Sequence, residues 1–444
     1  MKLWDKGAAL NEQIEKFTIG MDKEIDLLLA PYDVLGSLAH IQMLESIDLL
    51  TAEELEALQK ELKSIYRDVI EKGEFIIEPG IEDVHSQIEL MLTRKLGDVG
   101  KKIHSGRSRN DQVMVDLKLY IRNELKEITD LCVKLFETLQ SLSNTHKDVL
   151  LPGYTHTQIA MPSSFGLWFG AYAESLVDDM HLMEAAFKIT NQNPLGSAAG
   201  YGSSFPLNRQ MTTDLLGFES MNYNVVYAQM GRGKTEKSVS FALASIASTL
   251  SKFAADICLY NSQNFGFVTF PDQFTTGSSI MPHKKNPDVF ELIRAKTNKI
   301  QALPYEISLI TGNLISGYHR DLQVIKENFF PAFSNLRDCL EICEYAISQV
   351  QVNTDILKDP KYEHLFSVEV VNEKVLSGIP FREAYQLIGK EIAEGTYQPS
   401  GEVNHTHEGS IGNLMNENVA QKMQKVSKNI TGHSFGPALQ KLLD

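Results

Sequence analysis

Residues 113–142 read VMVDLKLYIRNELKEITDLCVKLFETLQSL, and this stretch decides the fold class. Its apolar residues recur at steps of three or four, which is the period of one face of an α-helix. A helix of about 30 residues extends ~45 Å, which is longer than an ordinary packed domain needs. The stretch therefore indicates a long helical bundle. The apolar stripe consists of Val113, Leu117, Ile121, Leu125, Ile128, Cys132, Leu135, Leu139 and Leu142.

Four further long helical patterns follow, over residues 163–189, 234–265, 288–314 and 330–350. Pro304 lies inside the third of them and should kink it, because proline has no N–H to donate. Alternation of apolar and polar residues at the period of a strand is scarce. We therefore predict an all-α protein with a central bundle of about five long helices.

The two ends of the chain carry shorter helical patterns, which glycine, proline, asparagine and histidine interrupt. We expect an N-terminal helical domain over residues 1–105, the long-helix bundle over 106–351, and a small C-terminal helical domain over 352–444. The two outer regions should form smaller helical caps on the bundle.

Composition excludes several classes of protein. The 444 residues carry a net charge of −15, which disfavours general binding to nucleic acid. The first 30 residues mix charges throughout, unlike a signal peptide. The longest uncharged stretch, 151–173, contains prolines and polar residues and is a poor membrane span. Four irregularly spaced cysteines favour reduced thiols over disulfides or a metal site. We expect a cytoplasmic protein with no membrane contact.

The loop over residues 276–287 is the most informative of the segments between the helices. Asn286 is expected to cap the next helix, with Pro287 at its first position. Free helix amides beside Lys284 would then suit a substrate carboxylate. Spacing alone is equally consistent with a helix-entry loop that carries solvated lysines.

Three other loops resemble it in composition, over residues 106–111, 152–158 and 194–204. Ser108 precedes Asp111 by three residues, as in a capping box. A solvated basic turn accounts equally well for the arginines in this loop.

His156 and the cluster Tyr318, Gln323 and Lys326 are further candidates. A lone loop histidine is more often structural, and His156 becomes a candidate proton donor only where it meets an acid such as Glu291. The polar cluster also fits an exposed turn. His405 and His407 near the C-terminus are weak evidence for a metal, because no cysteine or carboxylate set accompanies them.

The stretch GSSIMPHKKNP over residues 277–287 resembles the signature loop of the aspartase/fumarase superfamily. Three more stretches are similar to the argininosuccinate lyase family: HSGRSRNDQ at 104–112, PGYTH at 152–156 and KKNPD at 284–288. EDVH at 82–85 and YHRDLQ at 318–323 also match. The resemblance extends from about residue 17 to about residue 390.

This resemblance implies a homotetramer with a central core of twenty helices. It implies a reversible anti elimination that converts argininosuccinate to L-arginine and fumarate without a cofactor or a metal. By motif position, Ser278 would be the base and His156, paired with Glu291, the acid. Lys284 and Asn286 would hold the carboxylate and stabilise the carbanion. The residues implied to bind substrate are His85, Ser108, Arg109, Asn110, Thr155, Gln158, Arg232, Tyr318, Gln323 and Lys326.

Some stretches depart from the family pattern. Residues 229–234 keep Arg232 but lack the acids that usually flank it. A substrate-binding serine has no clear match near residues 18–22, and residues beyond 395 are unlike the family. Two alternatives stay open: another fumarate-releasing enzyme such as adenylosuccinate lyase, which would need a nucleotide-phosphate site, or a non-catalytic protein like the lens crystallins.

The length of the first helix has a consequence for the oligomer. Arg109 precedes this helix and His156 follows it, so the two lie at opposite ends of a rod ~45 Å long. They cannot touch one small substrate within a single chain. Antiparallel neighbours would bring these ends together, so we expect sites shared between subunits.

Overall fold

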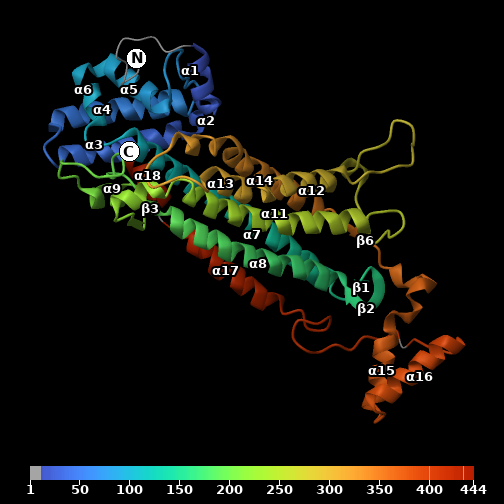
Figure 1. The fold of residues 1–444 in the computed structure, drawn as a ribbon. Helices are drawn as coiled ribbons and strands as arrows, with labels where there is room; N and C mark the ends of the chain where they lie inside the picture. The colour runs from blue at the N-terminus through green and yellow to red at the C-terminus, as the bar shows by residue number, and fades with distance from the viewer. Residues whose placement is uncertain (1–11, 400, 434) are drawn as a thin grey trace.

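The computed structural model describes residues 12–399, 401–433 and 435–444 and is mostly helical, which confirms the predicted all-α class (Figure 1). The stretch that decides the fold forms α7 (Arg109–Thr145), whose 37 residues span ~55 Å. The middle of its apolar stripe, from Leu117 to Leu139, is buried as predicted. α7 is therefore the axis along which the other long helices pack.

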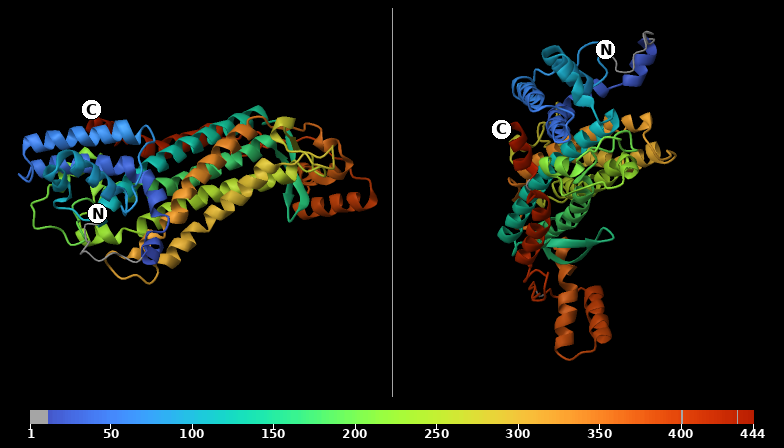
Figure 2. Two further views of the ribbon diagram at one scale, coloured as in Figure 1. Left: turned by 90° about the horizontal axis from the view of Figure 1, so that it is seen from above. Right: turned by 90° about the vertical axis from the view of Figure 1, so that its left-hand side faces the viewer.

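Among the described residues, five helices from the middle of the chain accompany α7 in the bundle. α7 packs against α8 and α14, and α11 packs against α8, α12 and α13 (Figures 1 and 2). The predicted kink is confirmed, because the third pattern divides at Ala302, two residues before Pro304. The bounds of these helices are α8 (Phe165–Thr190), α11 (Lys234–Tyr260), α12 (Asp288–Gln301), α13 (Leu303–Thr311) and α14 (Lys326–Ile347).

One carboxylate ties α8 to α11 through two aromatic side chains. Asp256 Oδ2 accepts hydrogen bonds from Trp168 Nε1 at 3.1 Å and from Tyr172 Oη at 2.6 Å. Both rings also contact Phe253, at centroid distances of 5.6 and 4.6 Å. Aromatic pairs add about 0.5–1.5 kcal/mol each beyond their buried area, so this cluster fixes how the two helices lie.

An N-terminal cap covers one end of the bundle. Its largest helix, α3, packs on α4 and on α7. Thr51 and Glu54 form a capping box at the start of α4. The cap consists of α1 (Glu12–Ile19), α2 (Asp22–Asp26), α3 (Ala30–Glu45), α4 (Ala52–Ser64), α5 (Val84–Leu96) and α6 (Asp98–Lys101).

In the part of the chain that the structure describes, six short strands make three two-stranded sheets, of which the hairpin of β1 (Leu150–Thr155) and β2 (Gln158–Ser164) is the largest. We expected residues 152–158 to form a loop, but residues 152–155 and 158 belong to these strands, and 156–157 form the turn between them. The two other sheets join β3 (Gln192–Asn193) to β4 (Ser220–Met221) in parallel and β5 (Val268–Thr269) to β6 (Gln351–Val352) in antiparallel fashion. Two short helices belong to the same part of the chain: α9 (Arg209–Leu215) comes between β3 and β4, and α10 (Val225–Met230) follows β4.

The C-terminal part of the chain divides between the two ends of the molecule. α15 (Ser367–Leu376) and α16 (Phe381–Glu394) protrude at the end opposite the cap and share a small apolar core (Figure 1). α17 (Asn416–Thr431) returns along α7 and α8, and α18 (Phe435–Leu443) contacts α3 and α9. The predicted domain boundaries remain predictions. They did not anticipate that α17 runs back along the bundle and that α18 reaches α3 and α9.

A buried arginine holds α18 in place. The Arg122 guanidinium lies 4.0 Å from the ring centroid of Phe218 and 4.7 Å from that of Phe435. Its N–H groups donate to Asn191 Oδ1 and to the Leu216 and Gly217 carbonyls. Burial lowers the pKa of Arg122 to about 9. Two aromatic faces and three oxygens thus replace the water around this cation.

Two stretches, 22–45 and 234–260, are long and apolar enough to cross a membrane by length and composition. Both pack within the molecule, the first largely as α3 on α7 and the second as α11 between α8 and α12. Buried core helices meet the same criterion, so the finding is weak evidence for a membrane span.

Candidate active site

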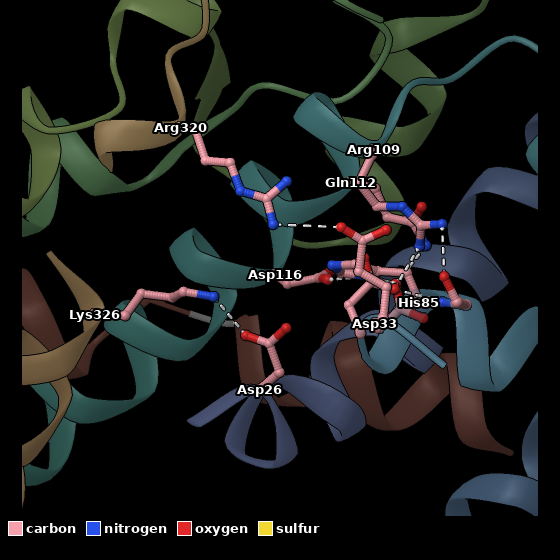
Figure 3. Close-up of polar contacts among 11 residues, drawn as sticks. Asp26, Asp33, His85, Arg109, Gln112, Asp116, Arg320 and Lys326 are labelled. Atoms are coloured by element: carbon pink, nitrogen blue, oxygen red, sulfur yellow. Dashed lines mark hydrogen bonds and ion pairs between the residues drawn. The ribbon is translucent and has the colours of Figure 1, made fainter. Parts of the chain in front are cut away.

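A cavity of about 380 Å³ lies where the N-terminal cap meets the bundle. It collects side chains from α2, α5, the start of α7 and the segment before α14 (Figure 3). Most of the residues predicted to bind substrate line it, although they come from distant parts of the chain. They are His85, Ser108, Arg109, Asn110, Arg232, Tyr318, Gln323 and Lys326.

The start of α7 forms as predicted and organises the cavity wall. Ser108 caps the helix, and Asp111 Oδ1 accepts from the Ser108 backbone N–H at 2.8 Å. The other oxygen of Asp111 accepts from the backbone N–H groups of Gly196 and Ala198, at 3.0 and 2.8 Å. Asp111 therefore ties the loop over residues 194–204 to the helix start and positions Arg109 beside the cavity.

Cations and carboxylates alternate around this cavity. Lys326 Nζ lies 2.7 Å from Oδ1 of both Asp22 and Asp26. Arg109 Nη1 lies 3.1 Å from Asp83 Oδ1 (Figure 3). Burial raises the pKa of Asp22 to about 6, even though Lys326 opposes the shift. A cavity of both signs suits a ligand that carries ammonium and carboxylate groups together.

The carboxylates of Asp22 and Asp26 were not among the predicted site residues. Asp22 and Asp26 are four residues apart and so lie on one face of a helical segment, which is a usable signal. Their partner, Lys326, is 300 residues away, and sequence spacing alone does not reveal such a pair.

Arg232 is buried. The acids expected to flank it in sequence are absent, but another carboxylate pairs with it. Glu236 Oε1 accepts from Arg232 Nε at 2.8 Å, and its other oxygen accepts from the Gly233 backbone N–H at 2.7 Å. The Leu322 carbonyl accepts from Nη2. Glu236, one helical turn further along α11, thus orients Arg232 at the cavity.

Thr155, His156 and Gln158 lie elsewhere, on the β1–β2 hairpin at the opposite end of the bundle (Figure 1). Thr155 pairs with Gln158, so His156 and Thr157 form the two-residue turn, with φ values of 51° and 61°. Such turns favour Asn-Gly, and a β-branched residue at positive φ is strained. Strain of this kind tends to mark functional positions.

The signature loop lies at the same far end of the bundle (Figures 1 and 2). A backbone bridge between Thr276 and Asn286 closes its base, with N···O distances of 3.3 and 2.9 Å. Inside the loop, Ser278 Oγ accepts from the backbone N–H groups of Ile280 and Met281, at 3.4 and 3.1 Å. Two amides thus point at the Ser278 hydroxyl oxygen.

The predicted cap of α12 was wrong by one residue. The helix begins at Asp288, so Pro287 occupies the cap position and provides no side-chain hydrogen bond. Asn286 pairs with Thr276 instead, and its amide donates to the Gly277 carbonyl at 3.4 Å. Because its backbone pairs with Thr276, Asn286 is not part of the helix, and its side chain lies inside the signature loop, close to Gly277.

The predicted pair between His156 and Glu291 is not formed within one chain, among the residues that the structure describes. Glu291 Oε1 lies 4.0 Å from Arg294 Nη2. Lys284 is exposed, and its neighbour Lys285 pairs with Asp272. All five predicted catalytic residues therefore lie on the hairpin, in the signature loop or in the first turn of α12, at the end of the bundle away from the cavity (Figure 1).

The cysteines and the histidines near the C-terminus lie outside the cavity. All four cysteines are free, as expected. His405 Nε2 lies 3.1 Å from Glu369 Oε1, so this residue of the His405–His407 pair joins the C-terminal segment to α15.

Comparison with known proteins gives consistent results. A family model described as "Lyase" matches residues 7–302. The chain is 65% identical to an argininosuccinate lyase of Parabacteroides distasonis, covering 100% of this chain and 99% of the relative. It is 39% identical to an argininosuccinate lyase of Thermotoga neapolitana, covering 88% of this chain and 98% of the relative.

Solved structures agree in fold. An EDDS lyase variant with bound fumarate superposes with a TM-score of 0.77 at 19% identity, covering 98% of this chain and 97% of that one. A class II fumarase from Schistosoma mansoni gives 0.72 at 15% identity, covering 94% of each chain. At these identities the likeness concerns the fold alone.

Proposed function

The chain belongs to the argininosuccinate lyase family, and from this premise we propose how the two ends of its bundle share one elimination reaction. It catalyses the reversible conversion of argininosuccinate to L-arginine and fumarate. The observation that carries the proposal is the cavity of mixed charge that gathers residues from four parts of the chain. We also propose that the enzyme works in the cytoplasm.

The cavity would hold the amino-acid end of the substrate. Argininosuccinate carries an ammonium and a carboxylate on the arginine part, two carboxylates on the succinyl part, and a guanidinium between them. Lys326 and Gln323 would bind the α-carboxylate, and Asp22 or Asp26 would face the ammonium. The ion pairs of Lys326 support this arrangement, because they keep both signs of charge in place before the ligand arrives.

The signature loop would act on the succinyl end. Removing the proton next to a carboxylate builds a dianion on that carboxylate, and positive groups must be placed there in advance. Lys284 and Asn286 would take this role. Ser278 would be the base, and the amides of Ile280 and Met281 support this assignment, because hydrogen bonds to an alkoxide stabilise its charged form.

His156 would complete the elimination. As the electrons of the dianion form the carbon–carbon double bond of fumarate, the bond to the guanidino nitrogen breaks. Protonated imidazole gives that nitrogen a proton, so that arginine departs with its guanidinium charge kept rather than as the less stable neutral guanidine. A Glu291 carboxylate from another chain would hold the ring. Every step of this scheme is assigned to side chains of the protein.

A homotetramer would bring the two ends together. The ~55 Å length of α7 separates the cavity from Ser278 and His156 in one chain, whereas antiparallel neighbours place unlike ends side by side. The bundle helices also expose apolar side chains that association would cover. Those on α8, α11, α12, α13 and α14 include Leu182, Phe241, Leu259, Leu292, Tyr305, Leu309, Ile342 and Tyr345.

The activity is tested by following fumarate through its ultraviolet absorbance. We expect the purified protein to release fumarate from argininosuccinate, and not from adenylosuccinate, aspartate or malate. Equal or faster release from adenylosuccinate would contradict the substrate assignment.

Mixing two inactive variants tests whether sites are shared. Lys326→Gln damages the cavity end and Ser278→Ala the loop end. After denaturing and refolding them together in equal amounts, we expect about one quarter of wild-type activity, because random assembly leaves one site in four with both ends intact. Each variant refolded alone is the control. A mixture that recovers no activity would show that both ends must come from one chain.

A further inference from the structure

A buried group of three side chains lies directly behind the cavity. His85 Nδ1 is 2.8 Å from Asp33 Oδ1 and 3.4 Å from Asp116 Oδ2 (Figure 3). The three residues come from α5, α3 and α7, and each is at most 2% exposed. Their ligating atoms all lie within 4.8 Å of one another. The two carboxyl groups and the imidazole are thus almost completely shielded from solvent.

The hydrogen bonds around this group are incomplete if both carboxyls are ionised. Gln112 Nε2 donates to Asp33 Oδ1 at 2.6 Å. Asp33 Oδ2 and both oxygens of Asp116 accept no hydrogen bond from any residue that the structure describes. A buried acceptor without a donor is costly, and two adjacent carboxylates repel. One proton on Asp116, donated to Asp33, removes the repulsion and satisfies an oxygen of each group.

His85 connects this group to the cavity. Its ring lines the cavity wall, while Nδ1 faces Asp33. Nε2 is buried and bonds to none of the described residues. An Nδ1–H bond to Asp33 fixes the plane of the ring, and it thereby fixes where Nε2 points.

We propose that Asp33 and Asp116 form a carboxyl pair that shares one proton and positions His85 to bind the substrate. This rests on the proposed function only in taking the cavity as the substrate site. Asp33 and Asp116 touch no part of the cavity themselves, so they are positioning residues that act through His85.

The charges around the pair favour this distribution. The pKa of Asp33 is lowered to about 2, because His85, Arg107 and the Gln112 amide outweigh its burial. The pKa of Asp116 is raised well above its usual range by burial and by the Asp33 carboxylate, and Asp26 on α2 adds to this, whereas Arg107 opposes it. The proton of the pair therefore resides on Asp116 in preference to Asp33.

Two amide variants separate the roles. Asp116→Asn keeps a neutral donor toward Asp33, and we expect kcat/KM within about threefold of wild type. Asp33→Asn replaces the anionic acceptor of the Nδ1–H by a neutral amide, and we expect KM to rise about 10- to 100-fold with a smaller change in kcat, as for the loss of a hydrogen bond to a charged group. Adding Asp33→Asn to His85→Gln should have little further effect on KM, because the residue through which Asp33 acts is already gone.

Infrared spectroscopy tests the shared proton without reference to activity. We expect the wild-type protein at neutral pH to show the C=O stretch of a buried protonated carboxyl, and Asp116→Asn to lose that band. Melting temperature and oligomer size of each variant show whether it folds. The band remains informative if argininosuccinate is not cleaved, so failure of the proposed function is a separate outcome.

Two results would overturn the proposal. The first is a spectrum without that band in the wild type. The second is an equal loss of activity in both amide variants, together with a divalent metal in proportion to the protein by elemental analysis. A bound cation would then occupy the place assigned to the proton.

Discussion

Replacing Ser278 by alanine is expected to lower kcat by about 10³- to 10⁴-fold, since the base that removes the succinyl proton is lost. KM should change little, because the cavity that would hold the arginine part lies at the other end of the bundle and keeps all its side chains. Fumarate release at saturating argininosuccinate measures kcat, and the dependence on substrate concentration gives KM.

The neighbouring serine provides a matched control. Ser279→Ala removes an exposed hydroxyl from the same loop, and we expect a loss no larger than about tenfold, from altered loop closure alone. The Ser278 hydroxyl, in contrast, accepts from two backbone amides. Losses of similar size in the two variants would mean that Ser278 is not the base.

The second large effect is expected for His156→Gln, which should lower kcat by about 10²- to 10³-fold. Glutamine retains an N–H near the position of the imidazole but cannot transfer its proton to the leaving nitrogen. The reverse reaction, addition of arginine to fumarate, should fall by a similar factor, because the same group must then remove a proton from the guanidino nitrogen. Both directions are measured by fumarate absorbance.

A surface histidine is the control for this variant. His181→Gln changes an exposed residue of α8 that lies 3.9 Å from Glu184, and we expect wild-type rates. The melting temperature of His156→Gln should also be recorded, because the strained turn at positions 156–157 links stability to the identity of these residues. Wild-type kcat in a folded His156→Gln protein would remove histidine from the mechanism.

Features that depend on residues within a few positions of one another were predictable. The spacing of apolar residues by three or four from Val113 to Leu142 specifies one buried helical face, and this pattern can be recognised within the segment alone. Pro304 divides its helix because it lacks an N–H. Ser108 and Asp111 close a capping box because the two residues are three apart.

The N-terminal cap of α12 could not be predicted from the residues next to it. Asn286 is a good capping residue, yet its backbone pairs with Thr276, ten residues earlier, and the helix begins two residues later than Asn286. A competing backbone hydrogen bond decided this position. The hairpin over residues 150–164 was also decided by backbone pairing. Pairing between its strands places His156 and Thr157 in a turn that the conformational preferences of these residues disfavour.

The arrangement of the site depended on tertiary structure throughout. The signature motif identified Ser278 and Lys284 as candidates, but not their separation from the cavity by the length of α7. Nor did any motif pair Lys326 with Asp26, or bring Asp33 to His85. By itself the sequence determined the helices, because the period and the caps of a helix depend on residues that are close together along the chain. Only tertiary structure decided which charges meet, because burial raises the strength of an ion pair and burial is set by helices distant along the chain.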